Sequence, residues 1–219
     1  MGHDLPQRPA ILIVGSPGVN ISAYFTWAES LEYEGYNVVF AKPSPTISSV
    51  LQAQEGLREF GDALALELGG FIALSHGYGG TLSIIAEIPA TGIGLIGSPL
   101  GPHLVATTPS PRPVDQGLPF PNDQTGELPT APITTSLSRE LAGWSENTPV
   151  MPDPYAPVVV IASDADVIAP PESVRLPTTD WSDRLWLREG FLSNNRSSHA
   201  DLLLDSKSAV EVIRALESL

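Results

Sequence analysis

Short, continuous apolar runs alternate with stretches of helical periodicity along most of this 219-residue chain. The predicted strands are residues 10–15, 37–41, 71–75, 93–97, 158–163 and 185–188, and the predicted helices are residues 22–34, 46–68, 81–88 and 199–216. A run that is apolar at every position is typical of a strand buried on both faces. Strands that alternate with helices at this spacing predict an α/β fold, with a mostly parallel sheet covered by helices on both faces.

Residues 98–157 interrupt this alternation. The stretch is rich in proline and has little apolar periodicity, except over residues 135–144, which are predicted to be helical with Ser138 as a possible cap. A connection this long between two strands is usually functional or disordered. We interpret it as a lid or cap inserted into one domain of residues 1–219, with disorder as the alternative.

Composition excludes several functional classes. The chain has no cysteine, which excludes disulfides, thiolate metal sites and cysteine nucleophiles, and favours a reducing compartment such as the cytoplasm. Residues 1–9 lack the apolar core of a secretory signal, and no apolar run approaches the ~20 residues of a membrane span. A net charge of −14 argues against nucleic acid or an anionic membrane as a partner. We therefore expect a cytoplasmic protein with a small-molecule substrate and no metal or cofactor, while the oligomeric state stays open.

Three segments contain recognisable motifs. They are residues 11–25 (ILIVGSPGVNISAYF), residues 74–80 (LSHGYGG), and residues 158–171 (VVVIASDADVIAPP) followed by residues 198–202 (SHADL). Together they resemble the α/β-hydrolases over nearly the whole chain. In that family these segments are the oxyanion loop, the nucleophile elbow, and the acid and histidine loops, in this order. The resemblance implies the α/β-hydrolase fold, with the Pro-rich insertion as its lid.

The elbow segment departs from the family pattern at its centre. The family pattern is usually G-x-S-x-G-G, and aligning Gly79 and Gly80 with its last two glycines puts Gly77 at the nucleophile. Glycine has no side chain that could form an acyl-enzyme, so Gly77 is incompatible with the serine-hydrolase mechanism and leaves space for substrate. Ser75, two residues earlier, is either a substitute nucleophile or a small residue that packs under the turn. An engineered serine-to-glycine change at Gly77 is compatible with the sequence as well.

The resemblance implies that the other two triad positions are retained. Asp166 lies after a predicted strand and before two prolines, where the family acid is found, and Asp164 is a competitor with less suitable spacing. His199 lies at the start of the last predicted helix, as the family histidine does. We predict that Asp166 orients His199 as a catalytic dyad.

The oxyanion loop and the remaining histidines complete the predicted site. The resemblance implies that the backbone N–H groups of Ser16 and Tyr78 stabilise a developing anion, which does not depend on their side chains. His76 occupies the position before the nucleophile and is expected to support the turn. His103 lies in the predicted lid, where it could contact substrate, and His3 is expected to be terminal and disordered.

A dyad without a nucleophile favours base chemistry. An imidazole oriented by a carboxylate can abstract a proton near neutral pH, and an enolate oxygen could bind the anion site. The main hypothesis is therefore a lyase or cyclase that eliminates acetate or another carboxylate from, or cyclises, a small polyketide-like or ester-bearing substrate. Two alternatives remain open. One is an esterase-type hydrolase that uses activated water or Ser75, and the other is a catalytically silent binding or scaffold protein.

Overall fold

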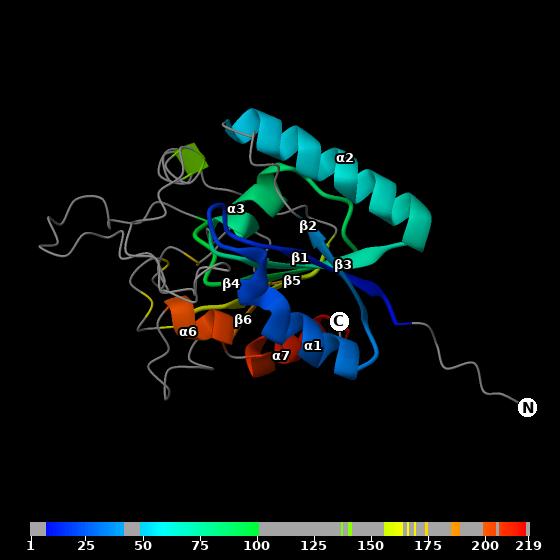
Figure 1. Cartoon of the computed structure of the whole chain (residues 1–219), viewed down its shortest axis with the longest axis vertical. Helices are drawn as coiled ribbons and strands as arrows, with labels where there is room; N and C mark the ends of the chain where they lie inside the picture. Colours follow the sequence, from blue (N-terminus) through cyan, green and yellow to red (C-terminus); the bar gives the residue numbers. More distant parts are fainter. Residues whose placement is uncertain are drawn as a thin grey trace, which may run out of the picture.

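A computed structural model shows one sheet with helices on both faces (Figure 1). It describes residues 8–41, 49–100, 137, 140–141, 156–163, 166, 169, 174, 185–188, 199–204 and 206–217, with the backbone alone at 185–188, 200, 201 and 204. The strands are β1 (Ala10–Val14), β2 (Asn37–Ala41), β3 (Phe71–His76), β4 (Gly92–Ile96), β5 (Val158–Ile161) and β6 (Leu185–Arg188). Their order is β2-β1-β3-β4-β5-β6, and every neighbouring pair is parallel. The predicted parallel sheet is confirmed.

Strand β1 shows why the apolar runs are continuous. All five of its residues are buried. Successive side chains of a strand point to opposite faces, so the sheet has two apolar sides to cover. Ile11 and Ile13 belong to one core cluster, whereas Leu12 and Val14 belong to another. Both faces of this strand are therefore core.

Helices supply the two covering layers. They are η1 (Ile21–Tyr24), α1 (Phe25–Tyr33), α2 (Val50–Leu68), α3 (Tyr78–Ile85), α6 (His199–Leu204) and α7 (Ser206–Glu217). Helices α2 and α3 cover one face, and α1, α6 and α7 cover the other (Figure 1). Trp27 and Val212 join the cluster of Ile11, while Leu57 and Leu82 join the cluster on the opposite face. The predicted coverage of both faces is confirmed.

Helix α2 has clear signals at both ends. The Ser49 side chain accepts a hydrogen bond of 3.3 Å from the Gln52 N–H, as an N-cap residue does. Gly69 ends the helix in the left-handed conformation, with φ of 74°, and its N–H donates to the Ala65 carbonyl at 2.9 Å. The predicted end of this helix is confirmed. The predicted start at Thr46 is four residues too early, because Ser49 is the extended N-cap residue and the helix begins at Val50.

Three other predicted helices differ from the structure. The predicted helix over residues 22–34 is the 3-10 helix η1 followed by α1, which ends at Tyr33. Helix α3 begins at Tyr78, three residues before the predicted start at Thr81, because the chain turns from β3 into the helix at Gly77 alone. The intervening Gly79 and Gly80 have low helix propensity, which hides the helix start in the sequence. The predicted last helix is two helices, α6 and α7.

The predicted lid is described at only a few positions. Leu137 and Leu141 are helical and buried in the core cluster that contains Val50 of α2. The Val50 N–H donates to Glu140 Oε2 at 3.2 Å, which satisfies a donor in the first turn of α2. Leu100 is also buried. The lid itself stays a prediction, since most of residues 98–157 lie outside the described residues.

Within the part of the chain that the structure describes, no helix is both long and apolar enough to cross a membrane.

Candidate active site at the turn around Gly77

The turn between β3 and α3 has the strained backbone expected of a nucleophile elbow. Gly77 adopts φ of 54° and ψ of −136°, a conformation that side-chain-bearing residues rarely adopt. The Gly77 N–H donates to the Ile96 carbonyl at 3.1 Å, and its carbonyl accepts from the Gly80 N–H at 3.0 Å. Glycine adopts this backbone without a steric penalty.

The glycines after the turn are explained by close packing. A Cβ atom at Gly79 would overlap the backbone carbonyls of Val14 and Gly15, and one at Gly80 would overlap the side chain of Ser98. Helix α3 therefore approaches β1 and the end of β4 too closely for a larger residue at either position.

The side-chain position of residue 77 lies beside the predicted histidine. A Cβ atom built on Gly77 would be 3.1 Å from His199 Nε2 and 3.0 Å from Ser16 Oγ. These atoms come from the start of α6 and from the loop after β1, respectively. The fold thus brings three segments that are distant in the sequence to the point where a nucleophile would stand.

His199 and Asp166 form a buried pair. His199 Nδ1 lies 2.7 Å from Asp166 Oδ2, and the Asp166 side chain is fully buried. Asp166 Oδ1 accepts a second hydrogen bond from the Ala169 N–H at 2.8 Å, so both carboxylate oxygens have partners. With an ionised carboxylate, Nδ1 of the imidazole carries the proton and Nε2 presents its lone pair toward position 77. The structure thus brings together the predicted acid and histidine.

The end of β4 makes room for this pair. Gly97 has φ of 53°, and a Cβ atom there would lie 2.9 Å from Asp166 Oδ2 and 3.1 Å from His199 Nδ1.

Three residues considered in the sequence lie outside the described residues. They are the competing acid Asp164 and the histidines His103 and His3.

His76 is packed behind the imidazole of His199. Their ring centroids are 4.4 Å apart, and His76 is fully buried. Burial is the main cause that lowers the pKa of His76 well below its ordinary value, and the charge of His199 lowers it further, whereas the His199 backbone carbonyl acts in the opposite direction. His76 is therefore neutral at physiological pH.

Tyr24 is a residue of the candidate site that no sequence motif indicates. Its hydroxyl accepts a 2.8 Å hydrogen bond from the Ser16 N–H and lies 3.3 Å from His76 Nδ1. Burial raises the pKa of this hydroxyl far above its ordinary value, so it stays protonated and can donate to His76. Tyr24 fits only because residue 15 is glycine, since a Cβ atom there would lie 2.7 Å from the tyrosine ring. Local sequence patterns do not reveal this packing of a glycine against a tyrosine, because they identify Tyr24 only as an apolar position of a predicted helix.

The hydrogen bond to Tyr24 changes the expected role of Ser16. The resemblance to the α/β-hydrolases predicts that the Ser16 N–H belongs to an oxyanion hole, but in the structure this N–H already has a partner. It could reach an anion only by exchanging that partner. The role of the Tyr78 N–H, at the first residue of α3, stays a prediction.

Ser75 is not placed as a nucleophile. Its hydroxyl lies 2.8 Å from that of Ser83, which in turn donates to the Gly79 carbonyl at 2.8 Å. The side chain is fully buried, so substrate cannot reach it. The structure favours the reading in which Ser75 packs under the turn, because β3 and α3 approach each other closely there.

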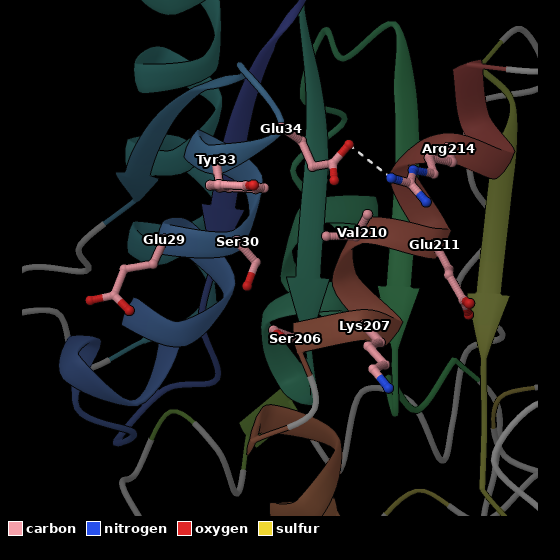
Figure 2. Close-up of a pocket in the computed structure, with 9 residues that line it drawn as sticks. All are labelled: Glu29, Ser30, Tyr33, Glu34, Ser206, Lys207, Val210, Glu211 and Arg214. Carbon is pink, nitrogen blue, oxygen red and sulfur yellow. Dashed lines mark hydrogen bonds and ion pairs between the residues drawn. The ribbon is translucent and has the colours of Figure 1, made fainter.

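A separate groove lies between α1 and α7 and contains none of these residues (Figure 2). Its volume is about 490 Å³, and it is lined by Glu29, Ser30, Tyr33, Glu34, Ser206, Lys207, Val210, Glu211 and Arg214. Arg214 and Glu34 form an exposed ion pair of 2.8 Å across it. No group of three or more metal-binding side chains gathers anywhere among the residues that the structure describes.

Known proteins match this chain in structure and not in sequence. No protein-family model and no curated protein matches it. A solved structure of a hydrolase of the α/β superfamily from Xanthomonas campestris matches with a TM-score of 0.58 and 14% identity, covering 95% of this chain and 100% of that one. A lipase from Bacillus licheniformis in its mature form matches with a TM-score of 0.64 and 15% identity, over 98% of this chain and 94% of that one.

A third match is a structure from work on carboxylesterases of the thaumarchaeon Nitrososphaera gargenis, with a TM-score of 0.63 and 11% identity, over 96% of this chain and 90% of that one. At such low identity the likeness shows a shared fold and not a shared activity. The sheet order, the strained elbow and these three matches agree: the chain has the α/β-hydrolase fold.

Proposed function

We propose that this protein is an ester hydrolase in which His199 and Asp166 activate water directly. The observation that carries the proposal is the position of His199 Nε2, which lies 3.1 Å from the Cβ position of a residue that has no side chain. The buried bond to Asp166 supports the imidazole that would accept a proton. The structural neighbours described as lipases and carboxylesterases favour ester chemistry over elimination or cyclisation.

The proposed reaction needs no covalent intermediate. His199 Nε2 takes a proton from water while the water oxygen bonds to the ester carbonyl carbon, and the carbonyl π electrons move to its oxygen. When the tetrahedral intermediate collapses, the C–O bond to the alcohol breaks, and His199 returns the proton to the leaving oxygen. General base assistance of this kind contributes roughly 10²–10⁴-fold. Asp166 stabilises the imidazolium that exists between the two steps.

A second candidate is a base-catalysed elimination or cyclisation of a small polyketide-like or ester-bearing substrate. It is favoured by the absence of a side chain at Gly77, which leaves room for a substrate carbon beside His199 Nε2. In an elimination, His199 takes a proton from carbon, a double bond forms, and a carboxylate leaves.

Oxygen isotope labelling separates the two reactions. The purified full chain is incubated with a panel of short-chain esters in water enriched in ¹⁸O. Hydrolysis places one solvent oxygen in the acid product, whereas elimination places none in either product. We expect incorporation, and a rate that falls about 10²–10⁴-fold in His199→Ala. Glu29→Gln, in the groove between α1 and α7, is the matched control and should retain the wild-type rate.

Two further readouts test the proposal. A fluorophosphonate probe should leave the wild-type protein unlabelled, because no nucleophilic serine is placed at the elbow. An unchanged rate in His199→Ala would reject the dyad. The absence of turnover with every ester would reject the hydrolase and leave elimination or cyclisation and silent binding as the alternatives.

A further inference from the structure

We infer that the Ser16 hydroxyl holds the attacking water against His199 Nε2, which makes Ser16 a water-positioning residue. The inference rests on the proposed function, because it concerns the water that this function requires. It assigns to Ser16 a role for its side chain, distinct from the backbone role that the sequence predicts.

The geometry places the hydroxyl and the imidazole around one point. Ser16 Oγ lies 3.0 Å, and His199 Nε2 lies 3.1 Å, from the Cβ position of residue 77. A water molecule bound at Gly77 would lie just beyond this position, within reach of both groups. Gly77 itself contributes no side chain to that volume.

The backbone of Ser16 is fixed by hydrogen bonds, whereas its side-chain hydroxyl is available to the candidate site. The Ser16 N–H donates to the Tyr24 hydroxyl at 2.8 Å, and its carbonyl accepts from the Val19 N–H at 3.0 Å. The hydroxyl itself has no hydrogen-bond partner in the described part of the chain, and Ser16 is only half-buried. An anchored residue with an unpaired hydroxyl is suited to bind a small polar molecule.

The absence of a direct bond within the described site favours a bridging water. No hydrogen bond joins Ser16 Oγ to His199 Nε2, although both lie near 3 Å from the same point. A serine that His199 deprotonated directly would need such a bond. A water molecule has two O–H donors, one for each of these groups. Its lone pair then remains directed away from both, toward the carbonyl carbon of an ester.

Three variants test this assignment. We expect Ser16→Ala to lower kcat by about 10- to 100-fold, because a misplaced water attacks poorly, and to change KM by less than about 3-fold. Ser16→Thr retains the hydroxyl and should recover kcat to within about 3-fold of wild type. Ser30→Ala, the same substitution in the groove of Figure 2, is the matched control and should leave both constants unchanged. Circular dichroism of each variant verifies the fold.

Each outcome distinguishes this assignment from the proposed function. A folded Ser16→Ala variant with wild-type kcat rejects the water-positioning role and leaves the dyad mechanism intact. Fluorophosphonate labelling that maps to Ser16 by peptide mass spectrometry rejects it too, since Ser16 would then be a nucleophile. If the wild type hydrolyses no ester, the proposed function fails first and the water-positioning role fails with it. Should Ser16→Ala not fold, Ser16→Cys provides the same comparison, because a thiol is a weak hydrogen-bonding group.

Discussion

The two sides of the candidate site, the elbow at Gly77 and the pair of Asp166 and His199, are held in place by different interactions. On one side, the elbow at Gly77 is made of backbone, and its shape depends on close packing of glycines against β1 and Ser98. On the other side, Asp166 and His199 interact through buried polar side chains and a further backbone N–H. The shape of an elbow and the chemistry of a triad are therefore separable. Packing retains the turn without a nucleophile, whereas the proposed base depends on two specific side chains.

Substitutions in the Asp166–His199 pair should lower activity more than substitutions in the elbow. Asp166→Asn keeps the shape of the acid but removes its charge and can favour the wrong imidazole tautomer. We expect kcat for ester hydrolysis to fall about 10²–10⁴-fold, equivalent to about 3–5 kcal/mol of barrier. Steady-state kinetics measures this, with Glu34→Gln as a surface control. An Asp166→Asn rate within 3-fold of wild type would show that the pair is structural only.

Substitutions of the elbow glycines should lower the free energy of unfolding more than substitutions in the Asp166–His199 pair. Gly80→Ala would place a Cβ atom against Ser98, and overpacking of this kind typically costs about 1–3 kcal/mol. Gly56→Ala, in the middle of α2 with open space around it, should instead stabilise by about 0.5–1 kcal/mol. Urea denaturation compares the two free energies of unfolding. Ser98→Gly should recover much of the loss in the Gly80→Ala background, and failure to do so would contradict the packing explanation.

A side chain restored at position 77 tests the elbow and the His199–Asp166 pair in one variant. Gly77→Ser should cost about 1–3 kcal/mol of stability, because φ of 54° strains any L-residue. It should also gain fluorophosphonate labelling at residue 77, since His199 Nε2 is already beside that position. Peptide mass spectrometry reads the label, and Gly77→Ala controls for the strain alone. A folded Gly77→Ser protein without label would mean that the dyad does not reach the elbow.

His76 gives the smallest effect, through pH. Its folded-state pKa is depressed, so the unfolded chain binds a proton that the folded protein does not, and stability is lost as pH falls below about 6.5. The contribution is at most about 1.4 kcal/mol per pH unit. His76→Gln removes this group, so its free energy of unfolding should fall less steeply than that of wild type between pH 7 and 5. Parallel curves for the two proteins would refute the assignment of His76 as a buried neutral imidazole.

Local patterns were sufficient for most of the architecture. Continuous apolar runs predicted a parallel sheet buried on both faces. The resemblance to the α/β-hydrolases predicted Gly77, Asp166 and His199 as one site, and the structure brings these residues together. The exact start of α3 was not predictable, because two glycines required by packing hide the helix. The sequence could not predict the packing of the Pro-rich stretch either, since it has no periodicity from which packing can be inferred.

The sequence by itself determined the covalent possibilities: without cysteine, and with glycine at the elbow, neither a thiol nor the side chain of residue 77 can attack a substrate. Only the tertiary structure decided which polar groups are available. It engages the Ser16 N–H with Tyr24, pairs Ser75 with Ser83, and leaves the Ser16 hydroxyl beside position 77. Sequence specifies the groups that each residue carries, but hydrogen bonds between distant segments determine which of those groups remain free to react.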